Sequence, residues 1–166
     1  MNDEKGAAIP VFDGRGGYVA ALQWGFAAAF EQGARRIVCC SPDFADWPLD
    51  DASLLQGLAA WLKRPQRKLQ LVARSYDEVP RRCARFNAWR ADWAHAIEAW
   101  VAPEELAAEL PNVLASDGAV SVHLIDALHW RGRAEFDERR ARQWCEQLDV
   151  VLQRSERGFA VNTLGL

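Results

Sequence analysis

The chain has 166 residues, half of them hydrophobic and about a quarter charged, and its formal net charge is −3 at pH 7. These values exclude a disordered chain and predict a globular protein with a substantial buried core. A net charge this close to zero indicates no class of partner by itself.

We expect one domain over residues 1–166, with a flexible polar start at 1–8 and an apolar tail at 159–166. No apolar stretch typical of a leader peptide follows the polar start. No apolar run approaches the length of a membrane span, so we expect no membrane partner.

The four cysteines indicate a reducing environment. None of them shows the CxxC spacing of a zinc site, so we expect no metal. Cys39 and Cys40 would alternate between the two faces of a strand, which suits buried thiols. We therefore expect a soluble cytoplasmic protein without a cofactor. A thiol-based activity at Cys39 or Cys40 is a separate hypothesis.

Residues 9–74 alternate between helical and strand patterns. Apolar side chains three or four positions apart predict helices, and short β-branched runs predict buried strands. Glycine after the first helix and aspartate before the second are typical of helix ends. The expected elements are a short strand or extended lead-in at 9–12, a helix at 18–31 ended by Gly33, a strand at 35–40, a helix that begins at Asp50 or Asp51 and is ended by 64–67, and a strand at 68–74.

A third helix, with Pro80 in its first turn, is expected to run to Trp93. Residues 95–101 then form a strand or the tail of that helix. A final helix is expected over 137–154, before Gly158.

The hairpin signal at Asp117-Gly118 is the strongest local pattern in the chain. These two residues separate two apolar runs, and a type I′ turn needs positive φ at both of its central residues. We therefore predict two antiparallel strands joined by a tight turn there.

The order of these elements predicts an α/β fold. Alternating helices and strands with short connections imply parallel strands joined by right-handed crossovers. The late hairpin adds antiparallel strands. We expect a single mixed, mainly parallel sheet with helices on both faces.

Polar residues at strand ends are candidates for ligand binding, because ligands of open α/β sheets gather at the carboxyl ends of the strands. Ser41, Asp43, Arg74 and Ser75 are expected at these ends. Arg74 is a candidate because arginine can bind an anion through two hydrogen bonds. Ordinary loop polarity is the alternative.

Charge is unevenly distributed along the chain. Residues 63–90 are rich in Lys and Arg, whereas 91–130 contain no Lys or Arg at all. A patch for an anion or nucleic acid is one interpretation, and two oppositely charged faces that pair within or between subunits is the other. The candidate patch consists of Arg81, Arg82, Arg85 and Arg90.

Asp117, His123 and His129 complete the candidate ligand-binding residues. His123 lies in an alternating strand and His129 in the loop after it, and neither belongs to a recognisable nucleophile motif. A glycine-rich turn at 14–17 precedes a helix and could cradle phosphate. It lacks the lysine and hydroxyl residue of a phosphate-binding loop.

The strand Arg35–Cys40, the strand Lys68–Arg74 and the hairpin at Asp117-Gly118, each followed by a helix, resemble one half-unit of the phospholipase D superfamily. The resemblance covers roughly residues 18–155 and implies that family's fold. The family motif is His-x-Lys-x4-Asp, with the Asp just before the hairpin turn.

With Asp117 in the register of the motif aspartate, Leu110 stands where the nucleophilic histidine belongs and Asn112 where the phosphate-binding lysine belongs. Attack on phosphorus needs an imidazole and a cation, and these residues supply neither. The resemblance therefore implies no catalytic residue. A rival register uses His129, Arg131 and Asp137, but its aspartate lies one residue too far along.

Family enzymes unite two such motifs, by tandem repeat or by homodimer. The function that we predict is a non-catalytic, cytoplasmic binding or assembly module, homodimeric, with a possible anionic ligand. The alternative is a phosphodiesterase-type enzyme or a nucleic-acid-binding protein that uses Arg74, His123, His129 and the basic residues of 81–90. Nucleic acid is possible but not favoured.

Overall fold

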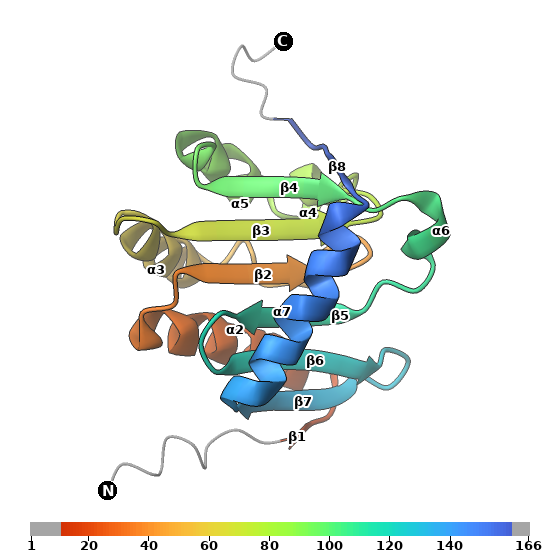
Figure 1. Cartoon of the computed structure of the whole chain (residues 1–166). Helices are drawn as coiled ribbons and strands as arrows, with labels where there is room; N and C mark the ends of the chain where they lie inside the picture. Colours follow the sequence, from red (N-terminus) through yellow and green to blue (C-terminus); the bar gives the residue numbers. More distant parts are fainter. Residues whose placement is uncertain (1–10, 161–166) are drawn as a thin grey trace, which may run out of the picture.

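The computed structural model describes residues 11–160, which fold around an eight-stranded sheet (Figure 1). The strands lie in the order β1-β7-β6-β5-β2-β3-β4-β8. Their bounds are Val11–Phe12 (β1), Arg36–Cys40 (β2), Lys68–Ala73 (β3), Ile97–Val101 (β4), Asn112–Ser116 (β5), Val120–Asp126 (β6), Arg131–Phe136 (β7) and Glu156–Arg157 (β8).

Most neighbouring strands are antiparallel, so the expectation of a mainly parallel sheet is wrong. β2 pairs parallel with β3, and β3 with β4. The other five pairings are antiparallel. The helix–strand alternation that implies parallel pairing ends at β4. Beyond it, short turns join β5, β6 and β7, and short turns connect antiparallel neighbours.

Helices cover both faces of the sheet, as the sequence predicted. The two long helices α2 and α3 lie on one face, and α7 crosses the other (Figure 1). Among the described residues, none of the helices has the length and hydrophobicity needed to span a bilayer. The helices are α2 (Arg15–Gln32), α3 (Ala52–Leu62), α4 (Val79–Arg82), α5 (Ala84–Trp89), α6 (Glu104–Ala107) and α7 (Glu138–Gln153), with a 3₁₀ turn η1 (Arg90–Trp93).

The ends of the long helices follow the sequence signals. Gly33 ends α2 with a φ of 79°, the left-handed conformation of a helix C-cap. Of the two candidate aspartates before α3, Asp51 is the cap, and it accepts a hydrogen bond from the backbone N–H of Ser53. Asp137 caps α7 in the same way.

An apolar layer packs on each face of the sheet. The larger layer fills the space between the sheet and α2 and α3, and the smaller one lies under α7. Cys39 belongs to the first and Cys40 to the second, so the two thiols alternate faces as expected. Both are fully buried.

The helix expected after Pro80 is broken at Cys83, whose φ of −129° lies outside the helical range. The carboxylate of Asp50 accepts hydrogen bonds from the backbone N–H groups of Arg85 and Phe86, at 2.7 and 3.0 Å. Asp50 therefore caps α5 from a different part of the chain, and α4 and α5 form two short helices instead of one long one.

The short strand expected at 9–12 is present as β1, whereas two strands, β7 and β8, lie beyond the predicted pattern. β7 and β1 extend the sheet past the hairpin, and β8 follows α7 and pairs with β4. β7 alternates charged with small residues and lacks the apolar run that marked the other strands. α7 ends at Gln153, close to the predicted end. Gly158 does not follow the helix directly, because β8 lies between them. The start at 1–8 and most of the tail at 159–166 fall outside the described residues.

The hairpin between β5 and β6 is confirmed, but its turn is not type I′. Neither Asp117 nor Gly118 has a positive φ. The Ser116 hydroxyl accepts hydrogen bonds from the N–H groups of Gly118 and Val120, at 3.1 and 3.2 Å, and so closes a wider loop. A Cβ on Gly118 would displace the end of the Gln32 side chain, whose oxygen accepts a hydrogen bond from the backbone N–H of Ala119 at 2.9 Å.

Candidate functional site

The carboxyl ends of β2, β3 and β4 meet at one edge of the sheet, because these strands are parallel. β5 runs the opposite way and therefore begins at this edge, with Asn112. The edge brings together Ser41 and Asp43 after β2, Arg74 and Ser75 after β3, and Asn112. Two separate hollows formed by residues within 11–160 lie at this edge.

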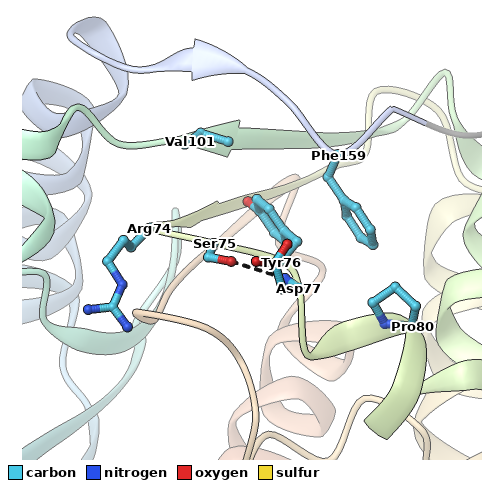
Figure 2. A pocket seen from close by; sticks show the side chains of 7 residues that line it. All are labelled: Arg74, Ser75, Tyr76, Asp77, Pro80, Val101 and Phe159. Atoms are coloured by element: carbon cyan, nitrogen blue, oxygen red, sulfur yellow. Dashed lines mark hydrogen bonds between the residues drawn. The ribbon is translucent and has the colours of Figure 1, made fainter.

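The first hollow lies beside Arg74 and has a volume of about 430 Å³ (Figure 2). The Arg74 side chain is exposed and turned away from Phe159, and within residues 11–160 it forms no hydrogen bond or ion pair. Ser75 accepts a hydrogen bond from the backbone N–H of Asp77 at 3.1 Å. Arg74 is therefore a cation without a partner among the described residues, at the mouth of the hollow, as an anion site would need.

Tyr76 and Phe159 form the inner wall of this hollow, and their contacts are with the protein itself. The Tyr76 hydroxyl donates a hydrogen bond to the carbonyl oxygen of Trp100 at 2.7 Å and accepts one from its N–H at 3.2 Å. Phe159 stacks on the Tyr76 ring at a centroid distance of 4.7 Å. Burial raises the pKa of Tyr76. The hydroxyl is thus protonated and already bonded, and it cannot act as an acid or base on a ligand.

Arg90 does not belong to a surface patch, which corrects the sequence prediction. Its side chain is buried, with its guanidinium 3.7 Å from the ring centroid of Phe159. It donates a hydrogen bond to the carbonyl oxygen of Phe159 at 2.7 Å. Arg90 therefore fastens the segment after β8 to the core.

The second hollow surrounds Asn112, which the sequence prediction aligned with the motif lysine, and has a volume of about 160 Å³. Its charged lining residues are the carboxylates Asp43 and Asp46, and Arg15 of α2 pairs with Asp46 at 3.1 Å. No His, Cys, Lys or Arg is found among the described residues that line it. Leu110, which the sequence prediction aligned with the motif histidine, is buried in the apolar layer under α7.

Tyr18 and Trp47 also line the second hollow, and sequence reasoning missed both. Their hydroxyl and indole N–H are buried without a hydrogen-bond partner in the part of the chain that the structure describes. Burial raises the pKa of Tyr18, and the nearby Trp47 N–H lowers it only in part. In the sequence, Tyr18 lies in a helical pattern and Trp47 in an aromatic loop, and both patterns predict buried apolar residues. No sequence signal therefore indicates that either residue lines a hollow.

Asp117 lies at the other end of β5 from Asn112. Its carboxylate accepts hydrogen bonds from the backbone N–H groups of Arg35 and Arg36, at 3.1 and 3.3 Å. Its own N–H donates to the carbonyl oxygen of Arg36 at 3.1 Å. Asp117 therefore joins the hairpin to the start of β2, and it does not share a site with Arg74.

The two candidate histidines occupy different places. His123 is half-buried on the α7 face of β6, with its ring 4.6 Å from that of Trp144. Burial and the neighbouring Arg140 lower the pKa of His123. His129 is exposed in the turn between β6 and β7, where its Nδ1 lies 2.9 Å from the Asp126 carboxylate. Neither histidine contacts the hollow beside Arg74.

The remaining basic candidates are exposed on α4 and α5. Arg81 and Arg82 both pair with Glu78, which neutralises part of their charge. Arg85 is exposed as well. Over residues 11–160, no group of three or more His, Cys, Asp or Glu side chains could hold a metal ion.

No family model and no curated protein matches this sequence. Solved structures do match. A phospholipase D family member, Nuc from Salmonella typhimurium, is 12% identical with a TM-score of 0.56, over 92% of this chain and 99% of Nuc. The fold is phospholipase D-like. The likeness at this identity concerns the fold alone, and it confirms the single mixed sheet with helices.

A second match is TrmBL2, an archaeal chromatin protein whose structure shows a novel mode of DNA binding. It is 13% identical with a TM-score of 0.61, over 90% of this chain. The match covers 54% of TrmBL2, so this chain spans about half the length of that protein.

Proposed function

We propose that this chain is a non-catalytic phospholipase D-like domain, a single unit that serves as a cytoplasmic binding or assembly module. The observation that carries the proposal is the hollow around Asn112. In the motif register it is the place where phosphodiester chemistry would occur, yet its charged lining residues are two carboxylates. Arg15 offsets the charge of Asp46, and the carboxylate of Asp43 would repel a phosphodiester, because like charges a few ångströms apart are unfavourable.

The position of the motif nucleophile supports the same conclusion. Leu110 is buried in an apolar layer and has no atom that could attack phosphorus. Asn112 can donate a hydrogen bond but carries no charge to offset the charge of the transition state. The degenerate motif thus lacks both of the chemical functions that the family's reaction uses.

Hydrolysis of bis(p-nitrophenyl) phosphate tests the absence of catalysis. We expect no release of p-nitrophenol above the buffer rate. Turnover that is lost in Asn112→Ala, His123→Ala or His129→Ala, with the fold retained, would overturn the proposal. Gln147→Ala on the exposed side of α7 is the matched control.

Assembly as a homodimer is part of the proposal. Ile125 and Leu128 expose 59% and 81% of their surface near the end of β6, and this is the edge at which Asn112 pairs with Leu124. Exposed apolar side chains at this edge suit an interface that brings two such edges together.

The molar mass in solution tests the dimer. We expect a dimer for the wild type and a monomer for Leu128→Asp, while Val150→Asp on α7 should remain dimeric. A monomeric wild type would contradict this part of the proposal, and leave the absence of catalysis standing.

Nucleic-acid binding is the second candidate function. It is favoured by the exposed Arg81, Arg82 and Arg85 and by the fold shared with the DNA-binding TrmBL2. Fluorescence anisotropy with a labelled DNA duplex at 50 and 200 mM salt would test it. Salt-sensitive binding with a smaller salt slope in the Arg81/Arg82/Arg85→Gln variant would support this candidate over the leading one.

A further inference from the structure

A third hollow, of about 270 Å³, lies on the α7 face of the sheet, apart from the two at the carboxyl edge. Three neighbouring elements supply its walls, so its shape depends on the packing of α7 against β6 and β7. The lining side chains include Ser121 and His123 from β6, Arg133 and Glu135 from β7, and Arg140 and Trp144 from α7.

The charge of this hollow is positive. Arg133 and Arg140 approach the same Glu135 carboxylate, at 3.5 and 3.3 Å. One carboxylate shared at these distances neutralises one guanidinium at most, and several N–H donors of both arginines have no partner within residues 11–160. The lining therefore carries one net positive charge even when His123 is neutral.

His123 makes the charge of the hollow sensitive to pH. Its ring lies against Trp144, with 4.6 Å between the centroids. Burial and Arg140 lower its pKa, and Glu135 opposes them. An anion in the hollow would offset the repulsion by Arg140 and stabilise the imidazolium, so binding of the anion and protonation of His123 should each favour the other.

We propose that this hollow binds a tetrahedral oxyanion of the phosphate type between Arg133, Arg140 and His123. Two guanidinium groups and an imidazole, which come from three different elements and line the same hollow, can donate hydrogen bonds to the oxygens of such an anion. This ligand class rests on the binding module proposed above. The hollow that would bind the anion is separate from the hollow around Asn112.

The test is an NMR titration of the histidine ring signals between pH 5 and 8, in sulfate and in chloride at equal ionic strength. Sulfate is the probe because it keeps its charge over this range. We expect sulfate to raise the apparent pKa of His123 and to leave that of the exposed His129 unchanged. Sulfate affinity should be several-fold tighter at pH 5.5 than at pH 7.5.

Arg140→Gln supplies the matched variant. It removes a cause of the lowered pKa, so the pKa of His123 should rise in chloride alone, and the additional rise in sulfate should disappear. Arg140→Lys should keep part of the sulfate effect. A His123 titration that is identical in sulfate and chloride, or a shift shared equally by His129, would overturn the proposal. Neither result would bear on hydrolysis or on the dimer.

Discussion

Asp117, which the sequence prediction aligned with the aspartate of a catalytic motif, binds backbone N–H groups in the structure. The residues around it predicted a turn, and the structure has one. Its partners Arg35 and Arg36 lie about eighty positions earlier in the chain, so no local pattern reveals them. The same holds for the candidate site. Arg74 was predicted at a strand end, whereas the grouping of His123 with Arg133, Arg140 and Trp144 depends on tertiary packing.

Replacement of Asp117 tests its structural role. Asp117→Ala leaves two backbone N–H groups without their acceptor and should lower the free energy of unfolding by about 1–2 kcal/mol. Asp117→Asn should cost less, because the amide oxygen can still accept a hydrogen bond. Urea unfolding followed by tryptophan fluorescence measures both. An unchanged midpoint for the alanine variant would show that these hydrogen bonds contribute little.

The buried cysteines give a second prediction at this scale, and it bears on the hypothesis of a thiol-based activity. Burial raises the pKa of Cys40 to about 12 and that of Cys39 well above its usual range. The reactive thiolate is therefore scarce at neutral pH. We expect Ellman's reagent to react slowly with the native protein between pH 7 and 9, and with all four thiols after unfolding. Rapid stoichiometric reaction of Cys39 or Cys40 in the native state would contradict this.

At the scale of elements, local sequence patterns predicted the helices whose apolar stripes and caps lie within or next to the helix itself. α2, α3 and α7 have apolar stripes and capping residues within their own sequence, and all three are present. The break between α4 and α5 depends on Asp50, a residue of another loop, and could not be predicted from the segment itself. β7 was missed because its face toward α7 carries charges where a buried strand would carry apolar residues.

The pairing of β3 with β4 includes a polar cluster around Glu98. Its carboxylate lies 2.7 Å from the ammonium of Lys68 and accepts hydrogen bonds from the Gln70 amide and the Trp100 indole N–H, at 3.0 and 3.1 Å. Burial alone would raise the pKa of Glu98. The three donors outweigh it and lower the pKa to about 2.

This shift predicts how stability depends on pH. The carboxylate has a lower pKa in the folded than in the unfolded chain, so its contribution is complete above about pH 4.5 and is lost as the pH falls toward 2. We expect a loss of about 1–2 kcal/mol over that interval, after allowance for solvent screening. Thermal unfolding of the wild type and Glu98→Gln from pH 2 to 6 measures it. Equal pH dependence in the two proteins would show that another group is responsible.

At the scale of the whole molecule, the sequence predicted an α/β sheet covered on both faces and a phospholipase D-like layout, and both are confirmed. The balance of parallel and antiparallel strands was wrong, because it was inferred from the first hundred residues and the rest of the chain turns back on itself. The fold is phospholipase D-like, and the charged side chains that line the hollow around Asn112 are the carboxylates of Asp43 and Asp46.

The most direct test of this account concerns the covalent step that the family motif would perform. The protein is incubated with excess bis(p-nitrophenyl) phosphate, quenched rapidly at neutral pH and weighed intact by mass spectrometry. We expect the mass of the unmodified chain at every time point. A phosphoryl adduct on a histidine that forms and decays at the rate of p-nitrophenol release would contradict it.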